Sequence, residues 1–108
     1  MDNRGILKSL TQTIRNRINA DPSKSYVASL FNKGQDEILK KILEEAGEVT
    51  FASKDGESGK VICEVADLIF HLMIVLEFHG ASVEDVLDEL VRRDGVSGIL
   101  EKQTRNHR

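Results

Sequence analysis

The sequence predicts an all-α fold, a small helical bundle of about four main helices. Apolar residues recur every three or four positions in four separate segments, which is the spacing of one helical face. One proline and eight glycines in 108 residues leave long segments without a helix-breaking residue. No segment alternates apolar and polar residues as a half-buried strand would. At this length we expect one domain, over residues 1–108.

Turn signals bound the first two predicted helices. The first begins near Ile6 and ends before Asp21, because the residue before a proline is disfavoured in a helix. A polar connector that contains Tyr26 follows. The second helix covers about residues 36–52, and Asp55-Gly56 marks the turn after it.

The third predicted helix, at about residues 60–79, is apolar around most of its circumference. Such a helix needs other helices on several sides, and a chain of 108 residues has few of them to offer. We therefore expect a second copy of the chain to cover part of this helix, and so a homodimer.

The fourth predicted helix covers residues 83–92. Gly80 is placed to end the preceding helix, and Ser82 with Asp85 resembles a capping box that starts the next one. The tail after Asp94 is short and basic.

The composition excludes several classes of protein. The chain carries 15 basic and 18 acidic side chains, and this mildly acidic balance argues against a general nucleic-acid binder. The single cysteine excludes an internal disulfide and favours a reducing compartment. The longest apolar segment, residues 68–76, falls far short of the roughly 20 residues of a membrane-spanning helix. We expect a cytoplasmic protein without a membrane partner.

Five carboxylates on the second and third predicted helices are the informative feature of the sequence. Glu44-Glu45-x-x-Glu48 lies on one helix, and Glu64-x-x-Asp67 lies on the next. Residues three apart share one side of a helix, so Glu45 pairs with Glu48, and Glu64 pairs with Asp67. The connection is short enough to make the two helices antiparallel, and we expect both pairs to converge on one point.

A cluster of four carboxylates must take up protons or bind a cation, because like charges repel strongly at reduced dielectric. Oxygen ligands suit hard divalent ions, so Mg²⁺ is the expected metal and Mn²⁺ a possible substitute. The alternative interpretation is that these carboxylates lie on solvated helix faces and pair with lysines. The apolar neighbours of Glu45 and Glu64 favour the metal. A di-iron centre usually takes Glu-x-x-His pairs, which the sequence lacks.

The carboxylate motif resembles that of the all-α nucleoside triphosphate pyrophosphohydrolases, and other segments resemble the phosphoribosyl-ATP pyrophosphohydrolase family more specifically. The resemblance covers about residues 6–105. One departure is Glu37, where a lysine is expected; it bears on phosphate binding there and not on the metal site. The segments that carry the resemblance are Ser25-Tyr26-x-x-x-Leu30-Phe31-x-x-Gly34, Ile38-x-Lys40-Lys41, Glu44-Glu45-Ala46, Lys54-Asp55-Gly56, Glu64-Val65-Ala66-Asp67-Leu68 and Gly95-x-Ser97-Gly98-x-x-Glu101-Lys102.

The resemblance implies an enzyme of the second step of histidine biosynthesis, which hydrolyses phosphoribosyl-ATP to phosphoribosyl-AMP and pyrophosphate. It also implies dependence on Mg²⁺ and a homodimer. In the mechanism that we expect, the four carboxylates hold the metal against the triphosphate, and an activated water attacks the α-phosphorus. Glu44 lies about 100° around the helix from Glu45. It either orients or deprotonates this water, or it supports the metal ligands.

The triphosphate also needs cationic partners, and the candidates are Lys54, Arg93 and Lys102. Arg93 and Lys102 rank higher than the other cations because they fall within the family-like C-terminal segment. For each of them alone, a solvated surface charge is the simpler interpretation. Tyr26 either stacks on the base or ribose or lies at the edge of the core. His71 shares a helical face with the first carboxylate of its helix, and it either bonds a ligand carboxylate or is a satisfied core group.

Two other functions stay open at this stage. A pyrophosphohydrolase that removes non-standard nucleoside triphosphates would share the metal site but would lack the family-specific terminal segments. A non-enzymatic helical dimer with structural carboxylates would show no hydrolysis that depends on Mg²⁺.

Overall fold

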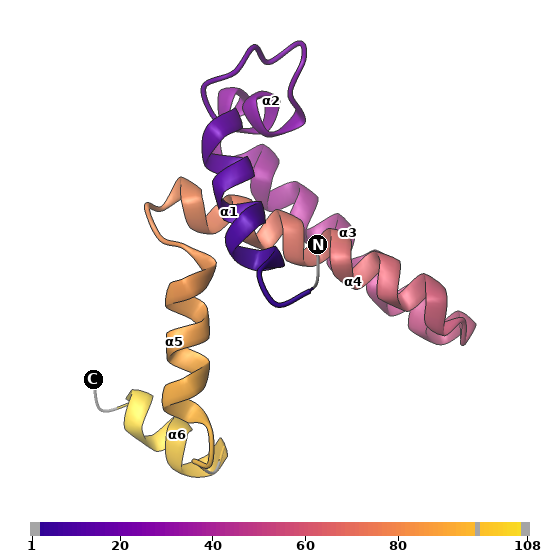
Figure 1. Cartoon of the computed structure of the whole chain (residues 1–108). Helices are drawn as coiled ribbons and strands as arrows, with labels where there is room; N and C mark the ends of the chain where they lie inside the picture. Colours follow the sequence, from indigo (N-terminus) through magenta and orange to yellow (C-terminus); the bar gives the residue numbers. More distant parts are fainter. Residues whose placement is uncertain (1–2, 97, 107–108) are drawn as a thin grey trace.

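The structure, a computed structural model, describes residues 3–96 and 98–106. Within these residues the chain forms six helices and no strand, so the all-α prediction is confirmed (Figure 1). The helices are α1 (Ile6–Arg17), α2 (Tyr26–Lys33), α3 (Gln35–Asp55), α4 (Ser58–Phe78), α5 (Val83–Arg93) and α6 (Gly98–Asn106). None of these helices is long and apolar enough to cross a membrane.

The two longest helices, α3 and α4, form an antiparallel hairpin that positions the carboxylates (Figure 1). Gly56 ends α3 with φ 75° and ψ 14°, a left-handed conformation that costs a glycine little and other residues more. Only Gly56 and Glu57 separate the two helices. The predicted second and third helices are therefore confirmed, although the second continues three residues beyond its predicted end.

The predicted count of four helices misses two short ones. The connector around Tyr26 is helical as α2, because the Ser25 Oγ accepts a hydrogen bond from the Ala28 N–H at 3.2 Å and Val27 and Leu30 are buried. An eight-residue helix gains most of its stability from such packing, which the local pattern does not display. The basic tail likewise contains a helix, α6.

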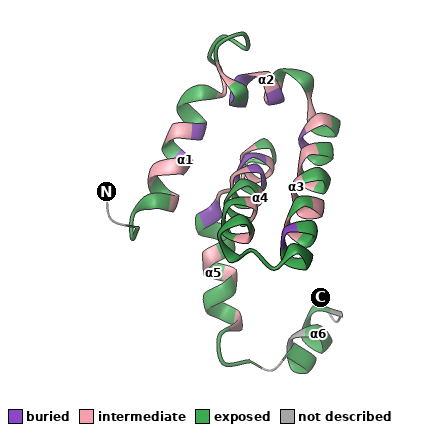
Figure 2. Cartoon of the chain, turned by 90° about the vertical axis from the view of Figure 1, so that its right-hand side faces the viewer, coloured by how far each residue is buried: buried purple, intermediate pink, exposed green. Residues whose placement is uncertain are grey.

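The hydrophobic core lies where α1, α2, α3 and α4 meet. In Figure 2, α4 lies between α1 and α3, and the buried residues gather around this meeting point. The four largest fully buried side chains, one from each of these helices, are Ile14, Leu30, Ile38 and Ile74. Toward the turn of the hairpin, Phe51 and Ile62 are exposed, and Leu43 is exposed in the middle of α3. One copy of the chain thus covers only part of the apolar circumference of α4.

The turn between α4 and α5 follows the predicted signals. Gly80 takes φ 72°, and the Ala81 N–H donates to the Leu76 carbonyl at 2.9 Å, which ends α4. The Ser82 N–H donates to Asp85 Oδ2 at 2.9 Å, which confirms the capping box of α5.

Candidate active site

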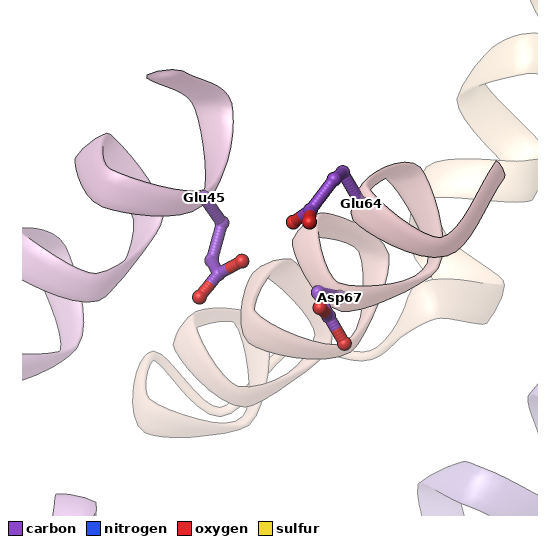
Figure 3. A group of neighbouring side chains, drawn as sticks. All are labelled: Glu45, Glu64 and Asp67. Carbon is purple, nitrogen blue, oxygen red and sulfur yellow. The ribbon is translucent and has the colours of Figure 1, made fainter. Parts of the chain in front are cut away.

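Three carboxylates from the α3–α4 hairpin converge at one point. Glu45 points from α3 toward Glu64 and Asp67 on α4 (Figure 3). Each residue offers one oxygen, and the three oxygens lie within 4.8 Å of one another. The i,i+3 spacing places Glu64 and Asp67 on one side of α4, and the antiparallel hairpin brings Glu45 opposite them.

The fourth predicted ligand, Glu48, lies outside this group of three. It follows Glu45 by one turn of α3, and its side chain is exposed. Its charge nevertheless acts on Glu64, so the two carboxylates lie within electrostatic reach of each other. The structure therefore gathers three of the four predicted carboxylates and leaves Glu48 beside them.

Burial and like charge both disfavour an ionised Glu64. Partial burial raises the pKa of the Glu64 carboxyl above its ordinary value, and the charges of Asp67, Glu48 and Glu45 raise it further. Lys60 opposes these effects, but its Nζ lies 3.3 Å from Asp55 Oδ2. The chain itself therefore leaves the negative charge at this point poorly compensated.

The donor set fits a small hard cation. Neighbouring oxygens around Mg²⁺ are separated by about 3 Å and opposite ones by about 4 Å, because each lies about 2.1 Å from the ion. The three oxygens are close enough to reach that spacing by small side-chain rotations. All three are carboxylate oxygens, which is the ligand type that Mg²⁺ and Mn²⁺ prefer.

Glu44 lies next to Glu45 on α3 but is not part of the group of three. Its side chain is exposed, and its Oε2 lies 3.5 Å from Lys41 Nζ. The charge of Glu44 raises the pKa of the Lys41 ammonium. Glu44 is thus a solvent-accessible carboxylate at the edge of the site, with Lys41 as a cationic neighbour.

Tyr26 is the first residue of α2, and its hydroxyl reaches His71 on α4. Its oxygen lies 2.7 Å from Nε2 of His71, and Nδ1 of His71 lies 2.8 Å from the carbonyl oxygen of Asp67. Both ring nitrogens of the buried His71 are therefore bonded, and its partner at Asp67 is the backbone rather than the carboxylate. His71 is a satisfied core group, as one of the two interpretations predicts.

Comparison with known proteins identifies the family. The family model for phosphoribosyl-ATP pyrophosphohydrolase matches residues 7–94. The chain is 57% identical over 100 residues to a phosphoribosyl-ATP pyrophosphatase from Neisseria gonorrhoeae, across 93% of this chain and 94% of that protein. It is 48% identical over 105 residues to one from Dechloromonas aromatica, across 97% of each chain. The chain belongs to the phosphoribosyl-ATP pyrophosphohydrolase family. Family membership makes it a hydrolase, and it confirms the resemblance of the motifs.

Within this pyrophosphohydrolase chain, two of the predicted substrate cations lie away from the carboxylates. Arg93 ends α5, and its Nε donates to Glu89 Oε1 at 3.1 Å. Lys102 is exposed on α6. The end of α5 and all of α6 lie apart from the α3–α4 hairpin in both views (Figures 1 and 2). A single copy of the chain does not bring Arg93 and Lys102 to the site.

The third predicted cation, Lys54, lies in the last turn of α3 and is exposed. It lies nine positions after Glu45, which corresponds to about 13.5 Å along the helix axis. A phosphate chain that extends from the carboxylates toward the hairpin turn would approach it. These cations stay predictions, and nothing in the sequence indicated the contact between Tyr26 and His71.

Proposed function

We propose that this chain hydrolyses phosphoribosyl-ATP to phosphoribosyl-AMP and pyrophosphate, the second step of histidine biosynthesis, with Mg²⁺ as cofactor. The observation that carries the proposal is the convergence of Glu45, Glu64 and Asp67 on the α3–α4 hairpin of a phosphoribosyl-ATP pyrophosphohydrolase family member. The relatives at 48–57% identity carry the name phosphoribosyl-ATP pyrophosphatase, which supports this substrate.

The residues that would hold the cation are Glu45, Glu64 and Asp67, with Glu48 as a fourth ligand or as a partner of a coordinated water. When bound, Mg²⁺ or Mn²⁺ would neutralise phosphate charge and favour attack at phosphorus. The raised pKa of Glu64 supports this role, because a cation removes the repulsion that causes part of it. With the cation bound, these carboxylates would also help to fix the place of the triphosphate.

Glu44 is the residue that we assign to the attacking water. The water oxygen forms a bond to the α-phosphorus, and the bond from this phosphorus to the α–β bridging oxygen breaks. Pyrophosphate leaves with that oxygen and its electron pair, and the proton of the water passes to the Glu44 carboxylate. Its exposure, its position beside Glu45 and the Lys41 ammonium 3.5 Å from its Oε2 support this assignment.

The substrate's organic part and its phosphates would contact the remaining candidates. Tyr26 is 48% exposed and would be available to the base or ribose, and the exposed Lys54 to the phosphates. Arg93 and Lys102 act on the substrate only if their helices approach a carboxylate group, which the structure of one copy does not provide.

The active form that we propose is a homodimer. Apolar side chains on α3, α4, α5 and α6 are between 67% and 77% exposed in one copy, which is unfavourable in water. They are Leu43, Phe51, Ile62, Val91 and Ile99. An apolar groove of about 340 Å³ also opens between α1, α4 and α5, with Leu7, Leu72, Met73 and Val86 among its lining residues. A second copy would bury both surfaces.

We also infer a cytoplasmic location. The one cysteine, Cys63, is a free and exposed thiol, and such thiols persist in reducing compartments. Fractionation of cells that produce the chain tests this inference.

The test of the function is pyrophosphate release from phosphoribosyl-ATP with and without Mg²⁺. We expect turnover with the metal and none with a chelator, and we expect Glu45→Gln to lower kcat by about 100-fold or more, since one ligand charge is lost. Glu84→Gln, the same substitution at an exposed carboxylate on α5, is the matched control and should retain activity. Faster turnover of non-standard nucleoside triphosphates than of phosphoribosyl-ATP would overturn the substrate. Hydrolysis that is independent of metal would overturn the site.

A further inference from the structure

A hydrogen-bonded pair of rings joins α2 to α4 beside the carboxylate group. Tyr26 and His71 are 45 residues apart in the sequence, and the Tyr26 oxygen lies 2.7 Å from His71 Nε2. The two rings meet edge to face, with their centroids 5.7 Å apart. His71 also contacts the backbone of Asp67, which lies one turn earlier on α4. The side chain of Asp67 is one of the three converging carboxylates.

The chemistry of the partners fixes the direction of both hydrogen bonds. A carbonyl oxygen can only accept, so Nδ1 of His71 carries the hydrogen and donates to the Asp67 carbonyl at 2.8 Å. In the neutral ring Nε2 then has a free lone pair, and it accepts the hydrogen bond from the Tyr26 hydroxyl. Phe70 also contacts the imidazole edge to face, at 5.7 Å between centroids. The imidazole is therefore held in one orientation.

Tyr26 is fixed at both of its ends. Its backbone belongs to the first turn of α2, which the Ser25 cap and the buried Val27 and Ala28 anchor. Its hydroxyl is bound to His71. The residue is 48% exposed, so part of this anchored side chain is open to solvent.

The charges of carboxylates on α3 reach the Tyr26 hydroxyl. Partial burial raises the pKa of the Tyr26 hydroxyl, and the charges of Glu45, Glu37 and Glu44 raise it further, while Lys41 opposes them. A charge acts in this way only over a short distance. The Tyr26 hydroxyl thus lies within electrostatic reach of Glu45 and Glu44.

We propose that His71 is a positioning residue: its hydrogen bond to the Tyr26 hydroxyl holds the tyrosine ring in place as one wall for the base or ribose of the substrate. The proposal rests on the proposed function. The tyrosine ring is already ordered in the folded chain. Substrate binding therefore does not lose the conformational entropy of ordering it. Loss of the bond then weakens substrate binding more than the chemical step.

Two substitutions at His71 separate the two hydrogen bonds. In His71→Asn the amide nitrogen replaces Nδ1, which keeps a donor toward Asp67 and removes the acceptor for Tyr26. In His71→Gln the amide group lies near the place of Nε2 and restores an acceptor. We expect His71→Asn to raise KM by about three- to tenfold, the range of one net hydrogen bond, with kcat within about twofold. His71→Gln should recover most of this loss.

A double-mutant cycle shows whether His71 acts through Tyr26. Tyr26→Phe should raise KM about as much as His71→Asn does, and His71→Asn should cause no further rise in the Tyr26→Phe background. His79→Asn is the matched control, because it makes the same change at an exposed histidine at the end of α4. Its KM should stay within about twofold of the wild-type value, since it lies outside the site.

Fluorescence provides a readout that does not depend on activity. Tyr26 is the only tyrosine, and the chain has no tryptophan, so the intrinsic emission comes from Tyr26 alone. A phenol that donates to an imidazole emits weakly, so His71→Asn should increase the emission while His79→Asn should not.

The outcomes distinguish this proposal from the proposed function. A wild-type chain that does not hydrolyse phosphoribosyl-ATP overturns the function and the positioning role together. A wild-type chain that is active, with unchanged KM in His71→Asn and Tyr26→Phe, overturns the positioning role alone. A lower Tm with unchanged KM would assign His71 a purely structural role. Additive effects of the two substitutions would also overturn the proposal, because His71 would then not act through Tyr26.

Discussion

Among single residues, Glu64 has the least favourable charge in the site. It is half-buried on α4, and one of its oxygens lies close to oxygens of Glu45 and Asp67. Lys60, whose charge acts on it, is paired with Asp55. Burial and these like charges raise the pKa of its carboxyl. Functional sites often contain an ionisable side chain whose charge is unfavourable in the folded chain but is needed to bind a ligand.

Glu64→Gln should therefore increase stability in the absence of metal. The substitution keeps the shape of the side chain and removes one of the repelling charges at neutral pH, so the Tm in a chelator should rise above the wild-type value. With millimolar Mg²⁺ the order should reverse, because only the wild-type chain gains the stability of a bound ion. Thermal melts of both proteins, with a chelator and with Mg²⁺, measure this.

The exposed Glu84 on α5 is the control position for this experiment. Glu84→Gln should not raise the Tm in a chelator, and it should not change the response to Mg²⁺. A wild-type Tm that is insensitive to Mg²⁺ and to Mn²⁺, together with an unchanged Tm in Glu64→Gln, would contradict the metal site.

At the scale of one element, α5 stabilises itself through its own side chains. The capping box of Ser82 and Asp85 starts the helix, and Glu89 accepts hydrogen bonds from Arg92 and Arg93 in its last turns. The helix projects away from the rest of the chain in Figure 1 and contacts α1 only near its start. Side-chain bonds within the helix therefore replace part of the packing that α3 and α4 obtain from each other.

The stability contributed by Glu89 should depend on pH. Its bonds to Arg92 and Arg93 lower the pKa of its carboxyl from the ordinary 4.5 to about 2. Because the pKa in the folded chain is lower, the contribution is complete above about pH 4.5 and is lost as the pH falls toward 2. The difference in free energy of unfolding between the wild type and Glu89→Gln should thus be largest near neutral pH and should decrease below about pH 4.5.

Urea denaturation over this pH range measures that difference. Asp88→Asn serves as the control, since it removes a neighbouring exposed carboxylate from the same helix. Its effect should vary less with pH. A Glu89→Gln difference that stays constant from neutral to acid pH would contradict the role of the two arginines.

At the scale of the whole molecule, the distribution of apolar surface indicates an incomplete assembly. The core is well packed where four helices meet, but the far end of the hairpin, α5 and α6 expose large apolar side chains. Large exposed apolar side chains on so many helices are more typical of a surface that a partner covers than of an isolated monomer.

Ile62→Lys should convert the proposed dimer into a monomer. Ile62 is 69% exposed on α4, so a lysine there costs an isolated chain little, but a buried lysine at an interface would be unfavourable. Light scattering after size-exclusion chromatography measures the mass. Gln12→Lys, on the exposed side of α1, should leave the mass of the wild-type assembly unchanged. A wild-type chain that is monomeric at all concentrations would contradict the dimer.

Much of the fold and part of the site follow from the sequence by itself. Periodicity, the Asp55-Gly56 turn and the Ser82 cap are local features, and they predicted four helices that the structure contains. The i,i+3 spacing paired Glu64 with Asp67 in the same way, because a helix fixes which of its own residues are neighbours.

Only the tertiary structure decided which residues meet across elements. The hairpin brings Glu45 to the pair on α4 and leaves Glu48 exposed beside them. The packing of α2 gives Tyr26 its contact with His71, and α5 and α6 carry Arg93 and Lys102 away from the carboxylates. The physical reason is that contacts between helices depend on how their buried faces fit together, whereas periodicity and capping act within a few residues of the chain.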